Sequence, residues 1–197
     1  WLYASASCFS ANDEGRAVLQ IIHDVAPGAT LSFATDIGGQ AHAANNIRAL
    51  RDAGAKVIVD DFIYFAEPMF QDGVIAQAVD DVVASGVVYV SSAGNEGRLG
   101  YDHAFVPGPF VASFGGTAHK FGGTITQRLK LPFGTDYRIV LQWDSPFASV
   151  SGPPGTVTDL DIYLSGSNGA GGVSVVAGAS EDNVFSGDPV EVLGFDC

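Results

Sequence analysis

Residues 57–90 read VIVDDFIYFAEPMFQDGVIAQAVDDVVASGVVYV, and this stretch decides the fold class of the first half of the chain. Two short apolar runs, Val57–Val59 and Val87–Val90, have the length and composition of buried strands. Between them, Gly73–Ser85 carries apolar residues at helical spacing, so we predict a helix there. A strand, a helix and a second strand in this order predict parallel pairing, because the helix returns the chain to the same end of the sheet.

The residues before this unit continue the same alternation. We predict helices over Glu14–His23 and Gln40–Ala53, and a short strand over Leu31–Ala34. The complete order predicts an α/β fold, with a parallel sheet that carries helices on both faces. We assign residues 1–117 to this portion and interpret residues 99–117 as a linker within it.

Beyond residue 118 the apolar residues alternate with a period of two. Gly, Ser and Pro clusters separate the alternating segments, as in antiparallel sheets with tight turns. The sequence therefore predicts that residues 118–197 form an antiparallel β-sandwich or jelly-roll module. The predicted strands are Tyr137–Trp143, Asp159–Leu164, Val173–Ala177 and Val190–Phe195.

Composition narrows the class of protein. The 197 residues are 47% hydrophobic, which excludes general disorder, and no apolar run reaches the roughly 18 residues of a membrane span. The net charge of −13 argues against a nucleic-acid partner. Cys8 and Cys197 are too few for a disulfide scaffold, and they are either paired or free. A chain that is acidic, rich in Gly and poor in Lys fits a secreted or cell-surface protein, and a start at Trp1 fits a piece of a longer one.

Candidate chemistry lies where the strands end, because ligands of open parallel sheets bind beyond the carboxyl ends of the strands. Asp60 and Asp61 close the first apolar run, and two carboxylates there must be solvated, paired or functional. Asn95 follows the second run, and its amide can donate to an oxyanion or simply occupy a left-handed turn. Glu14 opens the first helix, where an acidic residue also stabilises the helix dipole.

Two motifs resemble the subtilisin-like serine peptidases (subtilases). Ser91–Gly97, SSAGNEG, is similar to the oxyanion loop of this family, and Ile22–Ala29, IHDVAPGA, is similar to the segment after its catalytic-His helix. The resemblance implies that Asn95 donates to the oxyanion and that Glu14 takes the place of the catalytic His. A Glu in this role resembles the sedolisins, which are active in acid. By the same resemblance Asp61 lies at the substrate-binding floor and is expected to serve as the partner acid of Glu14.

The sequence also departs from these families. Sedolisins have Asp in the oxyanion loop and a second acid one turn after the Glu, whereas this chain has Asn95 and Val18. The nucleophile motif Gly-Thr-Ser-x-Ala-x-Pro is absent, since its nearest echo, Phe114–Ala118, lacks the Ser. The family's first catalytic Asp is absent too. The implied function is a secreted serine endopeptidase that cleaves a polypeptide by acyl transfer without a cofactor. We expect the remainder of the same protein to supply the nucleophile, so this chain alone is expected to be inactive.

Residues 137–195 resemble the jelly-roll modules of large secreted bacterial peptidases, some of which bind calcium. Asp159, Asp161 and Asp188 are the candidate calcium ligands, although acidic residues at these places also suit turns and solvated surfaces. Two other functions stay open. One is a non-catalytic subtilase-like protein that acts as a structural or binding element of a cell surface or assembly. The other is a carbohydrate- or protein-binding β-module joined to an inert α/β domain.

Overall fold

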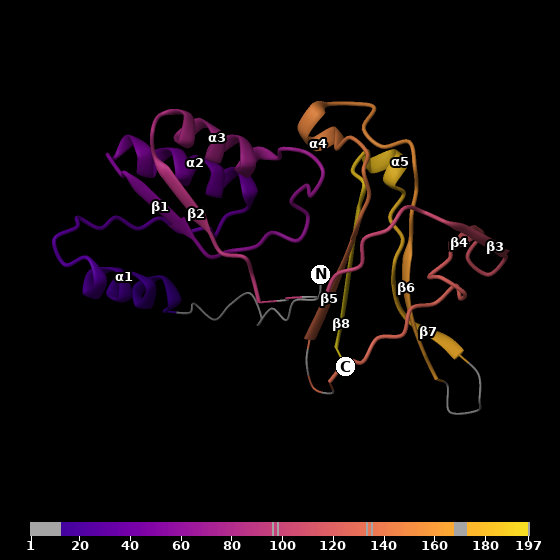
Figure 1. The fold of residues 1–197 in the computed structure, drawn as a ribbon. Helices are drawn as coiled ribbons and strands as arrows, with labels where there is room; N and C mark the ends of the chain where they lie inside the picture. Colours follow the sequence, from indigo (N-terminus) through magenta and orange to yellow (C-terminus); the bar gives the residue numbers. More distant parts are fainter. Residues whose placement is uncertain are drawn as a thin grey trace.

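A computed structural model shows how the chain folds (Figure 1) and describes residues 13–95, 97, 99–132, 134, 136–167 and 173–196. Within these residues the fold is mixed α/β, and the strands form two-stranded sheets: one parallel pair and several antiparallel pairs. No large parallel sheet occurs in the described part of the chain. Cys8 and Cys197 lie outside the described residues.

The first region is built on the predicted parallel pair. Strand β1 (Val57–Asp60) pairs in parallel with β2 (Val88–Ser91), and helix α3 (Val74–Ala84) connects them. Helix α2 (Gln40–Asp52) precedes β1 and packs beside α3 (Figure 1). These elements confirm the predicted strand–helix–strand unit and the helix before it.

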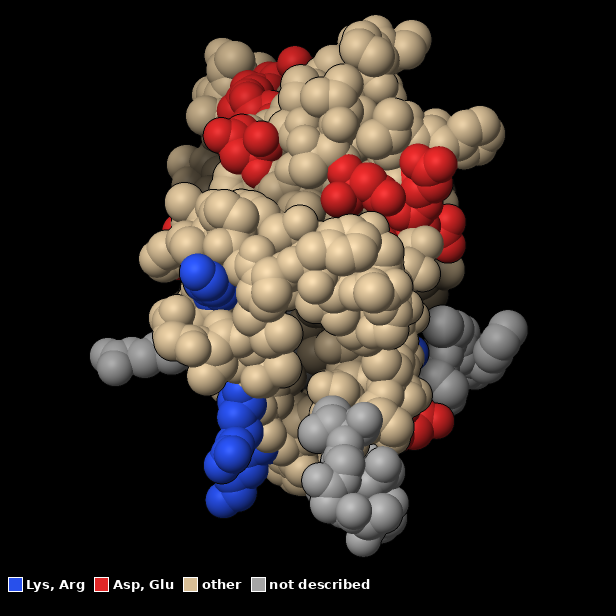
Figure 2. Space-filling view, turned by 90° about the vertical axis from the view of Figure 1, so that its right-hand side faces the viewer, with Lys and Arg blue, Asp and Glu red and all other residues tan. Residues whose placement is uncertain are grey.

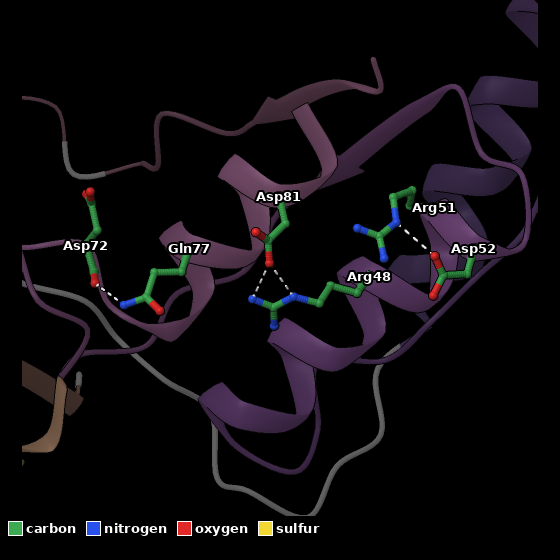
Figure 3. Close-up of polar contacts among 6 residues, drawn as sticks. All are labelled: Arg48, Arg51, Asp52, Asp72, Gln77 and Asp81. Carbon is green, nitrogen blue, oxygen red and sulfur yellow. Dashed lines mark hydrogen bonds and ion pairs between the residues drawn. The ribbon is translucent and has the colours of Figure 1, made fainter. Parts of the chain in front are cut away.

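An ion pair joins the two helices on their outer side. The Nε and Nη2 atoms of Arg48 on α2 both lie 2.7 Å from Oδ2 of Asp81 on α3 (Figure 3). Beneath this ion pair, small and branched apolar side chains form the core between the helices and β1. The alanines among them have short side chains, which allow the two helices to approach closely. The core residues are Ala43, Ala44, Ile47, Ile58, Ile75, Ala78, Val82 and Val87.

Helices cover only one face of the parallel pair. Ile58 is 4% exposed and belongs to the core with α2 and α3, whereas Val57 and Val59 are 58% and 51% exposed. Side chains alternate between the two faces of a strand, so the neighbouring valines lie on the opposite face. Helix α1 (Glu14–Val25), at its predicted place, contains no buried residue. The expected parallel sheet with helices on both faces is therefore present only as a pair with one covered face.

The predicted strand Leu31–Ala34 is wrong. Residues 30–36 form no strand, and side chains rather than a backbone ladder hold the end of this segment. Asn46 Nδ2 donates to the carbonyl oxygen of Thr35 at 2.7 Å, and the Tyr64 hydroxyl donates to that of Asp36.

The segment interpreted as a linker contains a β-hairpin. Strand β3 (Pro107–Val111) pairs antiparallel with β4 (Gly116–His119). The ring of Phe114 in the turn stacks on Tyr163, with ring centroids 4.3 Å apart. The hairpin therefore packs with the second half of the chain (Figure 1).

The second half forms an antiparallel β-rich region, as predicted. Two strand pairs contact each other through β7 and β8, and two short helices lie at one end (Figure 1). The elements are β5 (Asp136–Gln142) paired with β8 (Val190–Asp196), β6 (Ile162–Ser167) paired with β7 (Val173–Ala179), α4 (Ala148–Ser151) and α5 (Asn183–Ser186). Among the described residues, no helix is long and apolar enough to cross a membrane.

Candidate functional site

A pocket of about 310 Å³ opens at the carboxyl end of the parallel pair. Side chains from β1, β2, α3 and the loop between β1 and α3 surround it. Its polar wall consists of Asp60, Glu67, Asp80, Tyr89 and Ser91, and its apolar wall of Phe62, Ile75, Ala76 and Val79. This is the place where ligands bind in open α/β sheets.

The strand register brings Asp60 and its partners together. Ile58 pairs with Tyr89 and Asp60 pairs with Ser91, so all four side chains lie on the face of the sheet that α2 and α3 cover. The Ser91 hydroxyl donates to Oδ1 of Asp60 at 2.6 Å, and the Tyr89 hydroxyl donates to Oδ2. Both carboxylate oxygens of Asp60 are thus held by hydroxyl donors.

Burial and like charge both act on the carboxyl group of Glu67 in the pocket. Desolvation raises the pKa of Glu67, and the negative charge of Asp60 raises it further. Burial also raises the pKa of Tyr89, with a smaller contribution from its hydrogen bond to Asp60, so Tyr89 remains a donor. No Lys, Arg or His of the described chain forms an ion pair with Asp60 or Glu67. A carboxyl group whose pKa is raised by burial and by a neighbouring carboxylate is a feature that acid–base sites use.

Of the candidate residues from the sequence, Asp60 lines this pocket, and Asp61, Asn95 and Glu14 do not. Asp61 is exposed and does not line the pocket, whereas its neighbour Asp60 does. Asn95 is exposed in the loop that follows β2. Glu14 begins α1 and is exposed. The structure therefore selects Asp60 from the predicted pair Asp60 and Asp61, and it adds Glu67 as a second acid of the pocket.

Only one of the two acids of the pocket has a signal in the sequence. In a strand with Ile58 inward, a period of two places Asp60 inward and Asp61 outward, so alternation distinguishes the two acids. Glu67 lies in an irregular loop before a proline, and no periodicity indicates where its side chain points.

The predicted calcium ligands do not form a common site. Asp159 Oδ1 accepts from the backbone amide of Asn183 at 3.1 Å, and Asp188 Oδ1 accepts from that of Ser149 at 2.9 Å. Asp161 Oδ2 accepts from the Tyr163 hydroxyl at 3.0 Å. In the described part of the chain, no group of three or more His, Cys, Asp or Glu residues is placed to hold a metal ion. These carboxylates instead fix local turns and strand ends.

A further acid is buried in the β-rich region. Glu191 on β8 is 1% exposed, and its Oε1 accepts from the backbone amide of Glu181 at 3.0 Å. Its Oε2 is buried and has no hydrogen-bond partner among the described residues. Burial raises the pKa of Glu191, and the nearby carboxylates of Asp161 and Glu181 raise it further. This group affects stability and lies in a different sheet from the pocket.

Charge is unevenly distributed on the face of the β-rich region that Figure 2 shows. Acidic side chains gather in the upper part of that view, and the basic ones lie lower.

Comparisons with known proteins add no assignment, because no family model, no curated protein and no solved structure matches the chain.

Proposed function

We propose that the chain is part of a secreted subtilisin-like serine endopeptidase, in which the carboxyl edge of β1 and β2 binds the polypeptide substrate. The observation that carries this proposal is the pocket at that edge, where Asp60, Glu67 and Ser91 meet beside an apolar wall. Its apolar side suits a substrate side chain, and its polar side suits the groups around a peptide bond.

In this proposal the reaction is acyl transfer. A serine hydroxyl attacks the carbonyl carbon of the peptide bond, and a carboxylate base accepts its proton and later returns it to the leaving amine. Glu14 is the proposed base, and the side-chain amide of Asn95 donates to the oxyanion. No nucleophile motif occurs in the 197 residues, so the serine comes from outside them.

One observation favours a second candidate, a non-catalytic protein with subtilase-like ancestry that binds partners in an assembly. Val57, Val59, Val88 and Val90 are each at least half exposed and lie on one face of the parallel pair. An exposed apolar surface of this kind is typical of an interaction site.

Equilibrium binding of an unfolded polypeptide tests the peptidase proposal. Denatured casein is titrated into the fluorescently labelled chain, and we expect saturable binding that Asp60→Asn weakens by about tenfold, the effect of losing one charged hydrogen bond. Asp72→Asn is the matched control, because Asp72 is an exposed acid of the loop that precedes α3 and does not line the pocket.

Two results would contradict the proposal. One is binding that Asp60→Asn and Asp72→Asn weaken equally, which would place the polypeptide elsewhere. The other is an absence of polypeptide binding together with saturable binding of soluble glycans, which would favour the carbohydrate-binding module. A serine-directed phosphonate is expected to leave the chain unlabelled.

A further inference from the structure

A side chain of the β-rich region holds the loop that carries Glu67. Gln142, the last residue of β5, donates from Nε2 to the carbonyl oxygen of Glu67 at 2.8 Å and accepts at Oε1 from the backbone amide of Met69 at 2.9 Å. The two bonds lie on either side of Pro68, which has no amide hydrogen of its own. One planar amide therefore fixes the backbone from residue 67 to residue 69.

A second tie holds the far end of the same loop. Gln71 Oε1 accepts from the backbone amide of Phe147 at 2.9 Å, and Gln71 Nε2 donates to the Ser151 hydroxyl. Phe147 is 1% exposed, so this end is attached to a well-packed point of the β-rich region. Residues 67–71 are thus held at both ends by the other half of the molecule.

The loop has no regular structure that could position Glu67 by itself. Residues 61–73 between β1 and α3 form neither helix nor strand. The side chain of Glu67 nevertheless lines the pocket, half-buried and close enough to Asp60 for the two carboxyl groups to influence each other. Within the loop, the backbone amide of Glu67 donates to the carbonyl oxygen of Tyr64 at 3.0 Å. The bonds from Gln142 to Glu67 and to Met69 hold the same residues from outside the loop.

We propose that Gln142 is a positioning residue, which places the Glu67 carboxyl group beside Asp60 by binding the backbone of residues 67–69. The β-rich region thereby controls the arrangement of the two acids in the pocket. The meaning of this control for substrate binding rests on the proposed function, but the positioning itself is a property of the protein without substrate.

The test follows the titration of Glu67 by NMR in the full chain with ¹³C-labelled Glu side chains. Gln142→Met keeps the length and bulk of the side chain but removes its donor and its acceptor. We expect the Glu67 midpoint to fall toward that of an exposed Glu, because the released loop carries the carboxyl group into water and away from Asp60. Gln77→Ala is the matched control, since Gln77 Nε2 also donates to this loop, at the carbonyl oxygen of Asp72 at 2.8 Å, from within the first region (Figure 3).

A Glu67 midpoint that is the same in wild type, Gln142→Met and Gln77→Ala would overturn the proposal, and so would an equal fall in both variants. Gln142→Ser provides a second, smaller replacement in case the first variant fails to fold. Casein binding separates this result from the proposed function. If the Glu67 midpoint shifts in Gln142→Met but the wild type does not bind casein, the positioning role is supported and the peptidase function is contradicted. If the wild type binds casein but the Glu67 midpoint does not shift in Gln142→Met, the peptidase function is supported and the positioning role is contradicted.

Discussion

At the residue scale, the pocket depends on the carboxylate of Asp60. Ser91 and Tyr89 each donate a hydroxyl hydrogen to it, so both of its oxygens have a fixed partner. Glu67 has no such donors among the described residues and lies in the field of Asp60. Burial and the nearby carboxylate of Asp60 therefore raise the pKa of Glu67.

Neutralising Asp60 is expected to change the titration of Glu67. In Asp60→Asn the pKa of Glu67 falls, because the repulsion between the two carboxylates disappears, but it stays above the ordinary Glu value because burial remains. A pH titration followed by NMR measures this, with Asp72→Asn as the control that leaves Glu67 unchanged. A Glu67 midpoint that does not move in Asp60→Asn would contradict the proximity of the two acids.

Glu191 predicts a pH dependence of stability. Its pKa is raised in the folded state, so the folded state binds the proton more tightly than the unfolded state. The free energy of unfolding therefore falls as pH rises from the ordinary Glu pKa through the raised value, and it levels off above that. Glu191→Gln keeps an acceptor for the amide of Glu181 and removes the charge. At pH 7 we expect it to stabilise the fold by about 1–3 kcal/mol, because it replaces a buried charge with a neutral amide.

Urea unfolding at several pH values checks this prediction. The stability difference between Glu191→Gln and the wild type should shrink toward pH 4. Asp144→Asn is the control, because Asp144 is exposed and is not one of the carboxylates that raise the pKa of Glu191. A difference that is constant with pH would contradict a pKa of Glu191 that is raised by folding.

At the element scale, the layer of α2 and α3 supports β1 and thus the pocket. Val82 and Val83 are adjacent on α3, but Val82 is fully buried and Val83 is 50% exposed. We expect Val82→Ala to cost about 2 kcal/mol of unfolding free energy, since it removes two buried methyl groups and leaves a cavity. Val83→Ala should change it by less than about 0.5 kcal/mol. Thermal or urea unfolding of the pair provides the measurement, and equal costs would contradict the packing of α3.

Elements with a clear period could be predicted from the sequence, and elements defined by contacts could not. Glu14, Gln40 and Gly73 begin helical patterns, and α1, α2 and α3 start at or next to them. The segment around Leu31 has strand composition, but the side chain of Asn46 rather than a neighbouring strand binds the carbonyl of Thr35. The hairpin of β3 and β4 falls mostly within residues 99–117, which the sequence indicates as a linker. Its turn residue Phe114 stacks on Tyr163, and such a distant contact has no local pattern.

The candidate site likewise contains one acid that the sequence pattern indicates and one that it does not. Alternation along β1 distinguishes Asp60 from Asp61, so that part of the pocket follows from the sequence. The position of Glu67 does not follow from the sequence, because it depends on hydrogen bonds from Gln142, a residue 75 positions further along the chain. Contacts of this separation leave no periodic signal in either segment.

At the scale of the whole molecule, one surface stands out as apolar. The valine face, formed by Val57, Val59, Val88 and Val90, lies opposite the helices on the parallel pair. We expect it to bind an apolar dye such as ANS, and we expect Val59→Thr with Val88→Thr to reduce that fluorescence several-fold without unfolding, because Thr also favours strands. Val25→Thr on α1, which is 81% exposed, is the control for a single exposed valine. Unchanged dye binding in the double variant would contradict an exposed valine face.

The two regions meet at the loop that borders the pocket. The β-rich region therefore lies next to the pocket in which we propose that a ligand binds. A second cavity of about 380 Å³ lies at the junction, lined by Pro68 and Val74 from the first region and by Ser149, Val150 and Asp188 from the second. The molecule is thus arranged so that its β-rich half supports the candidate site instead of standing apart from it.

The most direct test of the account is to map a bound polypeptide onto the chain by NMR. The uniformly labelled protein is titrated with a pool of short peptides of mixed sequence, and the perturbed resonances are assigned. The account predicts saturable shifts centred on Asp60, Glu67 and Ser91, extending to Asn95. Shifts confined to the strands of the β-rich region, with Asp60 and Glu67 unmoved at saturation, would contradict it.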